Sequence, residues 1–328
     1  MAIAAFISPG KDLAGALERI RFAEKLGYEA VFTTHTMGRD GLAVAAAYGS
    51  GTSTIKVGTA VVPAFPRHPL ALGIEAATVD EIAGGRLILG IGPSHKLTME
   101  TFYGIPMDKP LSRIKEYVSI LRSLFTTNSV AHEGEFYEAR YTFMGYGARA
   151  DLPIMISALA PNMLRFAGQA TEGTILWACL PPYIRDVVSP TIRAGATEAG
   201  RDPSAVTIAA AVPTALTENR TAAFDAFRKD FFVYMTLPFY RRAIEGAGFG
   251  PEIKAFDEAQ ATNDFAGQLA AMSERLLDEF GAVGDAARIS DKYAEYREAG
   301  VTLPGVGLFN AGEGFAGFEA TLEAAASA

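Results

Sequence analysis

The chain has 328 residues, of which 49% are hydrophobic and 20% charged, which is typical of a globular protein with a large core. The formal net charge is −8, from 37 acidic and 29 basic residues, and no cluster of Lys and Arg stands out. Nucleic acid and anionic membranes are therefore not expected as partners. The single cysteine, Cys179, excludes an intrachain disulfide and a zinc site built from cysteines.

Neither a signal peptide nor a membrane span is predicted. The first ten residues, MAIAAFISPG, lack a basic segment before the apolar run and are interpreted as a first strand. The longest apolar stretch, residues 42–48, is far shorter than the roughly 20 residues that a membrane helix needs. We therefore expect a cytoplasmic protein.

In chain order, short runs of apolar and β-branched residues alternate with amphipathic helical patterns. Strands are predicted at residues 2–7, 30–34, 55–62, 86–91, 152–157, 174–177, 206–212 and 301–309. Helices are predicted at residues 12–27, 42–50, 69–83, 112–125, from 161, at 184–199, at 221–246 with a break at Pro238, at 285–299 and from 315. The stretch between 125 and 151 is expected to be irregular.

Eight strand–helix units favour a closed barrel. The strand at 86–91 reads RLILGI, a continuous apolar run that suits a parallel strand buried on both faces. Helical connections require parallel strands, and eight such units can close into a (β/α)8 barrel. An open doubly wound sheet is the alternative, but no G-x-G-x-x-G follows the first strand. We predict a single α/β domain over residues 1–328, a (β/α)8 TIM barrel with an insertion at roughly 245–284.

Three of the four histidines follow predicted strands, at the barrel end where functional groups of this fold gather. His35 follows strand two and His95 follows strand four, and histidine suits proton transfer near neutral pH. Both are candidates for a functional role. His68 precedes a helix in the sequence PRHP and is expected to cap or pack, and His132 falls in the irregular stretch.

Two familiar catalytic arrangements are missing. No H-x-H pair or neighbouring carboxylate accompanies these histidines, so no metal site is predicted. Gly-x-Ser-x-Gly is also absent, which disfavours a serine hydrolase of the nucleophile-elbow type.

Two loops after strands four and five look suited to an anion. Residues 90–95, GIGPSH, contain small residues that let backbone N–H groups approach a ligand. Residues 157–162, SALAPN, lead into a helix with Pro161 in its first turn, where free N–H groups and the helix dipole favour a phosphate. Together the loops predict a phosphorylated cofactor that spans the barrel mouth.

The segments around strands three and four resemble a known family. Residues 58–73, GTAVVPAFPRHPLALG, and 84–95, GGRLILGIGPSH, are similar to the luciferase-like monooxygenase superfamily. More narrowly, they resemble oxidoreductases that use the deazaflavin coenzyme F420 and are related to methylenetetrahydromethanopterin reductase. The likeness continues through residues 153–177, 187–201 and 234–244.

The resemblance implies an oxidoreductase that transfers hydride between F420 and a small organic substrate. An FMN-dependent luciferase-like monooxygenase or reductase is the alternative, because the two cofactors differ at ring position 5 and FMN can also activate oxygen. A third possibility is an inactive flavin-binding or partner subunit. The family also implies a homodimer, for which the helix at 42–51, rich in Ala and Gly, offers a close-packing face.

The resemblance also implies site residues. The catalytic histidine of the family aligns with His35, although Thr34 stands where the family usually has Asp, and many close relatives lack the histidine. A non-proline cis peptide at Ala60–Val61 would press on the cofactor ring, and Trp177 would lie in the ring region. The remaining cofactor contacts carried over are Gly92, Ser94 and His95 to the polar chain, and Ser157, Ala158, Ala160 and Pro161 to the phosphate. Ala160 replaces the usual glycine.

Overall fold

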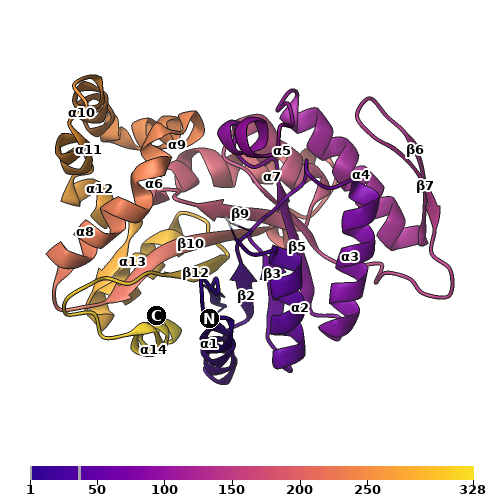
Figure 1. Cartoon of the computed structure of the whole chain (residues 1–328), viewed down its shortest axis with the longest axis horizontal. Helices are drawn as coiled ribbons and strands as arrows, with labels where there is room; N and C mark the ends of the chain where they lie inside the picture. Colours follow the sequence, from indigo (N-terminus) through magenta and orange to yellow (C-terminus); the bar gives the residue numbers. More distant parts are fainter. Residues whose placement is uncertain (1, 36–37) are drawn as a thin grey trace.

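Eight parallel strands close into a barrel in the computed structural model, which describes residues 2–35 and 38–328 (Figure 1). Each strand pairs with the next along the ring, and β12 returns to pair with β1, with Ala4 opposite Gly305. The predicted (β/α)8 fold is confirmed. The ring runs β1 (Ala4–Phe6), β2 (Ala30–Thr33), β3 (Lys56–Thr59), β5 (Leu87–Gly92), β8 (Ile154–Ser157), β9 (Gly173–Trp177), β10 (Thr207–Leu216), β12 (Leu303–Leu308).

Helices between consecutive strands cover the outside of the barrel (Figure 1). Several begin at an aspartate whose carboxylate accepts a hydrogen bond from an N–H of the first turn, as Asp12, Asp40 and Asp285 do. These caps fix where each helix leaves its loop. The covering helices are α1 (Leu13–Lys25), α2 (Gly41–Gly51), α3 (Pro69–Ile82), α4 (Pro110–Thr127), α5 (Pro161–Ala170), α7 (Ser189–Glu198), α13 (Ala286–Glu298) and α14 (Phe318–Ala326).

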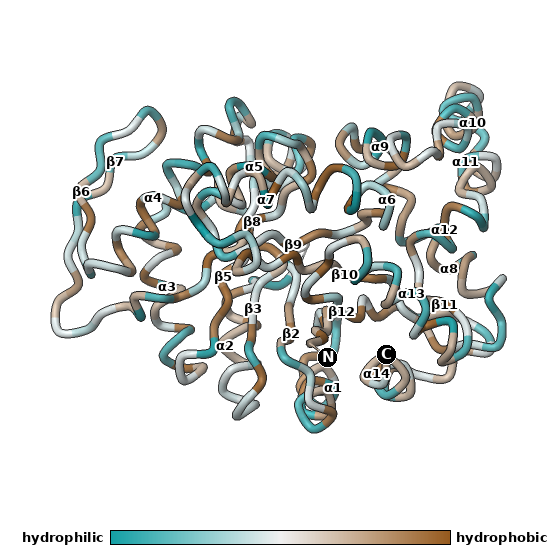
Figure 2. The backbone as a smooth tube through the Cα atoms, turned by 180° about the vertical axis from the view of Figure 1, so that it is seen from behind, coloured by the Kyte–Doolittle hydropathy of each residue, from teal (hydrophilic) through white to brown (hydrophobic). Residues whose placement is uncertain are grey.

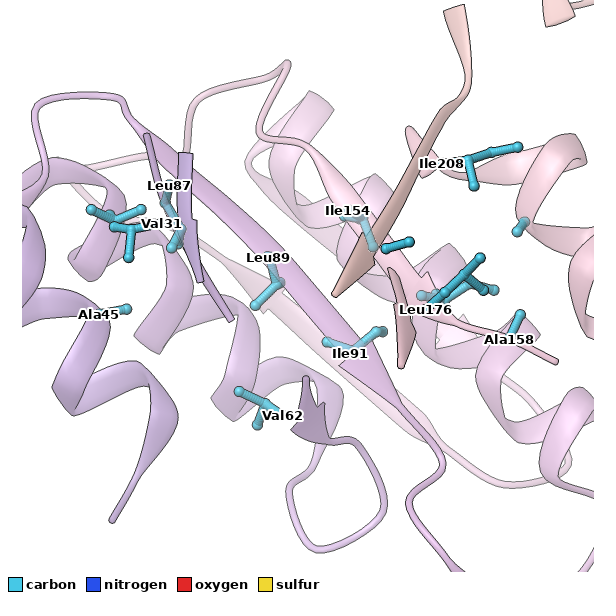
Figure 3. Close-up of a cluster of buried hydrophobic side chains, with 14 of the residues drawn as sticks. Val31, Ala45, Val62, Leu87, Leu89, Ile91, Ile154, Ala158, Leu176 and Ile208 are labelled. Carbon is cyan, nitrogen blue, oxygen red and sulfur yellow. The ribbon is translucent and has the colours of Figure 1, made fainter. Parts of the chain in front are cut away.

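The core has two layers because strand residues alternate in direction. On β5, Leu87, Leu89 and Ile91 belong to the cluster between the barrel and its helices, and Figure 3 shows the three side chains spaced along the strand. Ile88 belongs instead to a separate cluster inside the barrel. Figure 2 shows the central strands as predominantly hydrophobic. No helix in the described part of the chain is long and apolar enough to cross a membrane.

A helical segment lies between β10 and β12 and packs around its own apolar cluster, which contains Phe227, Phe231 and Phe280. The break predicted at Pro238 is confirmed, because one helix ends before it and another begins there. The segment comprises α8 (Arg220–Phe231), α9 (Pro238–Ile244), α10 (Gly250–Ala261), α11 (Phe265–Ala271), α12 (Glu274–Phe280) and the short strand β11 (Ala282–Gly284). The short helix α6 (Pro181–Tyr183) follows β9.

Two predictions of local structure need correction. The stretch between 125 and 151 is not irregular throughout, because β6 (Ser129–Glu133) and β7 (Glu138–Thr142) form an antiparallel hairpin beside α4 (Figure 1). The strand predicted at 55–62 is split, and its end forms the separate strand β4 (Val62–Pro63), which pairs with β5. The peptide bond between β3 and β4, Ala60–Val61, is cis, as the resemblance predicts.

Candidate functional site

The predicted site residues come together at the carboxyl ends of neighbouring strands. Ser157 ends β8 and Trp177 ends β9, and Ser157 pairs directly with Ile175 of that next strand. Gly92 ends β5 and pairs with Pro63, two residues after the cis bond. The sequence therefore places these groups around one end of the barrel, where functional loops of this fold lie.

Gly92 is where three of these segments meet. A Cβ atom at this position would lie 2.1 Å from Ser157 Oγ and 2.8 Å from Val61 Cγ2. Any side chain would therefore displace the end of β8 or the segment after the cis bond. Ala60 and Val61 are both half-buried and lie against the cluster inside the barrel.

The loop from β8 to α5 presents an uncapped helix start. Ala160 precedes α5 and offers no side-chain cap, and Pro161 takes the first helical position. Ala158 is buried, and the next carbonyl, that of Leu159, accepts a hydrogen bond of 2.9 Å from the Tyr183 hydroxyl. The loop is thus held in place while the N-terminal end of the helix dipole faces outward, which suits an anion.

His35 lies against the start of α2. Its Nδ1 accepts a hydrogen bond of 3.0 Å from the Gly41 N–H, and Asp40 Oδ2 lies 3.6 Å from the same nitrogen. Asp40 is also ion-paired with Arg67, and the His35 side chain is 13% exposed. Burial lowers the pKa of His35, the Arg67 charge lowers it further, and Asp40 opposes both effects.

An aromatic row joins His95 to Trp177. The His95 ring lies 5.9 Å from that of Tyr240, Tyr240 lies 4.9 Å from Tyr234, and Tyr234 lies 5.8 Å from Trp177, measured between ring centroids. Burial lowers the pKa of His95. The preceding residue, Ser94, has a left-handed backbone with φ of 65°. His95 and Trp177 therefore belong to one surface of the mouth.

Sequence reasoning missed Tyr234 and Tyr240 as site residues. They follow β10 by many positions and lie on the helical segment, so no strand end pointed to them. The available signal was the aromatic-rich run FFVYMTLPFY, residues 231–240. Trp177 Nε1 is buried and has no hydrogen-bond partner within residues 2–35 and 38–328.

Of the other two histidines, His68 contacts the β6–β7 hairpin and His132 belongs to it. His68 Nδ1 accepts a hydrogen bond of 3.2 Å from the Leu70 N–H, and its Nε2 lies 3.2 Å from the Glu138 carbonyl oxygen. His68 thus caps α3, as predicted. His132 Nε2 lies 3.4 Å from Glu116 Oε2. Within the described ranges, no group of three or more His, Cys, Asp or Glu side chains could hold a metal.

A cavity of about 410 Å³ lies at the opposite end of the barrel. It is lined by residues at the amino ends of strands, including Glu29, Lys56 and Arg86. Lys56 is paired with Glu29 at 3.0 Å, and Arg86 donates to backbone carbonyls, among them Ile55 O at 2.6 Å. These charges stabilise the bottom of the barrel, and the candidate site is the mouth that contains His35.

Comparison with known proteins shows which family the chain matches. The family model described as luciferase-like monooxygenase matches residues 2–303. A protein of Mycobacterium tuberculosis named as a coenzyme F420-dependent oxidoreductase is 27% identical over 311 residues, covering 87% of this chain and 88% of its own. The 5,10-methylenetetrahydromethanopterin reductase of Methanolobus tindarius is 28% identical over 285 residues, covering 86% of each chain.

Solved structures share the fold over nearly the whole chain. The coenzyme F420-dependent tetrahydromethanopterin reductase of Methanopyrus kandleri has a TM-score of 0.82 at 24% identity, covering 99% of this chain and 97% of its own. The oxygenating constituent of 3,6-diketocamphane monooxygenase from Pseudomonas putida, solved with FMN, has a TM-score of 0.69 at 17% identity. It covers 99% of this chain and 97% of its own.

Proposed function

Because the chain belongs to the luciferase-like monooxygenase family and is similar to a coenzyme F420-dependent oxidoreductase, we propose that it is itself an F420-dependent oxidoreductase. It would transfer hydride between the deazaflavin coenzyme and a small organic substrate. The observation that carries the proposal is the convergence of Val61, Gly92 and Ser157 at one mouth, in a chain similar to one relative and one solved structure that are named for F420.

The residues present fit a phosphorylated cofactor with a flat ring. The glycine at position 92 lets Ser157 of β8 and Val61 pack directly against the backbone of β5, which brings the segment after the cis bond and the loop before α5 together at the mouth. The uncapped start of α5, after Ala160 and Pro161, would hold the phosphate. Ser94 and His95 would contact the polar chain, and Ala60, Val61 and Trp177 would line the ring region. When bound, the deazaflavin supplies hydride chemistry.

The protein side chains would bind and orient the substrate and control access of water. His35 lies beside the strand that carries the cis bond, because Thr33 of β2 pairs with Thr59 of β3. A histidine there could donate a hydrogen bond to the reacting ligand. The row of His95, Tyr240, Tyr234 and Trp177 gives the opposite surface an aromatic character that favours an apolar or conjugated substrate.

FMN is the second candidate cofactor, favoured by the FMN complex of a protein with the same fold. Equilibrium titration of the purified protein with F420 and, separately, with FMN distinguishes the two. We expect F420 to bind at least tenfold more tightly than FMN. Tighter binding of FMN would indicate an FMN-dependent monooxygenase or reductase instead. Binding of neither cofactor would favour an inactive partner subunit.

A further inference from the structure

The contacts of His35 define its protonation state, an inference that rests on the proposed function of the site. We propose that the start of α2 holds His35 as the neutral tautomer with hydrogen on Nε2, so that this side chain acts as a hydrogen-bond donor and not as an acid–base group at the barrel mouth. Gly41 is then the positioning residue that selects the tautomer.

The argument begins with one hydrogen bond. Gly41 N–H donates to His35 Nδ1 at 3.0 Å, so this nitrogen must present a lone pair. A neutral imidazole with an acceptor at Nδ1 carries its hydrogen on Nε2. Protonation at Nδ1 would set its hydrogen against that of the Gly41 amide. Accepting a proton from a ligand at Nε2 would first require the hydrogen to move to Nδ1, which the amide blocks.

Asp40 could in principle favour the opposite arrangement, because a carboxylate beside an imidazole commonly accepts from Nδ1–H. Its Oδ2 atom, however, lies 3.6 Å from Nδ1, beyond hydrogen-bond distance. Both carboxylate oxygens have other partners, since Oδ1 accepts from the Ala43 N–H at 2.9 Å and Oδ2 is paired with Arg67. The amide contact therefore decides the tautomer.

The charge of Arg67 also favours a neutral ring, whereas that of Asp40 opposes it. Arg67 faces His35 from the loop before α3 and is held by Glu75 at 3.3 Å as well as by Asp40. The positive end of the α2 dipole also disfavours an imidazolium at this place. The lowered pKa of His35, caused first by burial and then by Arg67, agrees with this arrangement.

A neutral Nε2–H group has a limited chemical use. It can donate a hydrogen bond to an oxygen or nitrogen on which negative charge develops, in the way that donors of an oxyanion hole do. We therefore infer that the substrate presents an acceptor atom to His35, as a carbonyl or a carbonyl-conjugated double bond does. The proton that completes the product would come from solvent or from another group, and His35 would stay neutral.

Nitrogen NMR of the cofactor-free protein tests the tautomer without any assay of activity. Protein labelled with 15N in its four histidines would be measured at pH 7, and His35→Gln would assign the signals of His35. We expect a pyrrole-type shift for Nε2 and a pyridine-type shift for Nδ1. A hydrogen on Nδ1, or an imidazolium at pH 7, would overturn the proposal whether or not the protein binds F420.

A matched pair of variants tests the positioning role of Gly41. Gly41→Pro replaces the amide hydrogen by a ring carbon, which also pushes the imidazole away because N and Nδ1 are only 3.0 Å apart, whereas Gly41→Ala keeps the hydrogen. A Cβ at position 41 would lie 3.3 Å from His35 Cβ in both variants, so the comparison is between the two. Relative to the alanine variant, we expect the proline variant to raise the pKa of His35 and to mix its tautomers. Equal titration curves for both variants would refute the role of the amide. Circular dichroism and the unchanged signals of the other histidines would show that each variant is folded.

The surrounding charges give two further variants with opposite signs. Arg67→Met should raise the pKa of His35, because it removes a cation and leaves Asp40 unpaired. Asp40→Asn keeps a helix cap and should lower the pKa of His35. Shifts in the same direction for both variants, or no shift in either, would contradict the proposed electrostatic environment.

Discussion

At the start of α5, Ala160 stands where a phosphate would approach the free N–H groups of the helix. Ala160→Asp would place a carboxylate against that phosphate, and we expect F420 binding to weaken by more than tenfold. Ala160→Asn is the matched control, because it has the same shape without the charge. Cofactor affinities measured by fluorescence titration would show the difference, and equal affinities for Asp and Asn would mean that the phosphate binds elsewhere.

The side chain of His35 can be tested by its replacements. If it acts as a neutral donor, His35→Ala should lower turnover by about 10²-fold, the effect of losing one well-placed donor. His35→Gln keeps an N–H group and should stay within roughly tenfold of the wild type. Steady-state rates with a substrate of the wild-type enzyme would decide. A loss as severe in Gln as in Ala would indicate that titration of the imidazole matters.

Residue-level prediction from sequence succeeded where a motif or a strand end marked the position. The cis bond at Ala60–Val61 and the capping role of His68 were predicted correctly. The contact between His35 and Gly41 was not, because it depends on the tertiary position of the end of β2 relative to the start of α2. Neither hydrophobic periodicity nor a motif indicates such a tertiary contact.

Among the secondary-structure elements, α1 is tied to the start of β3 by a single carboxylate. Glu24 Oε1 accepts from the N–H groups of Ser53, Thr54 and Ile55 at 2.8, 2.6 and 3.0 Å. Burial raises the pKa of Glu24, but these hydrogen bonds outweigh burial and lower it to about 2 from 4.5. This contribution to stability is therefore complete above pH 4.5 and is lost as the pH falls from 4.5 towards 2.

Glu24→Gln tests this tie between the elements. We expect it to reduce the free energy of unfolding by about 1–3 kcal/mol at pH 7, because charge-assisted hydrogen bonds to three amides are weakened. The difference between variant and wild type should shrink as the pH is lowered from 4.5 to 2. Urea unfolding at several pH values measures it, and a difference independent of pH would contradict the assignment to the Glu24 charge.

Elements were predictable in proportion to how apolar they are. The barrel strands are buried on both faces, as the run LILGIG of β5 shows, so their position could be predicted from composition alone. The hairpin strands SVAHE and EARYT are mostly polar, and only Val130 and Ala139 are buried, so no alternating pattern marked them. Helix positions beside the site, such as Tyr234 and Tyr240, depend on tertiary folding that periodicity cannot report.

At the scale of the whole molecule, we infer that residues 1–328 form one domain. Its largest apolar cluster runs from Ile3 to Ala325, and Tyr28 donates a hydrogen bond of 2.8 Å to the Leu322 carbonyl, so both ends of the chain share one core. The helical segment between β10 and β12 adds the second cluster and contributes Tyr234 and Tyr240 to the mouth. This helical segment is thus part of the candidate site.

The resemblance implies a homodimer with its interface on α2. The structure favours a different position for this interface. The small residues of α2 are used inside the chain, since a Cβ on Gly49 would lie 2.7 Å from the Ala83 Cβ. Ala43 is one of the few exposed positions of α2. Larger apolar side chains are exposed near the end of α3 and after the β6–β7 hairpin, where Ile82 is 48% and Met144 is 91% exposed.

We therefore predict a dimer whose contacts lie at the end of α3 and the loop after β7. Light scattering at working concentration should give about twice the 34.8 kDa of one chain. Met144→Asp should shift the mass towards the monomer, because a charge would have to be desolvated in an apolar contact. Ala43→Arg, on the exposed face of α2, is the control and should leave the mass unchanged. A monomeric wild type would refute the dimer. Dissociation by Ala43→Arg but not by Met144→Asp would indicate that the interface lies on α2.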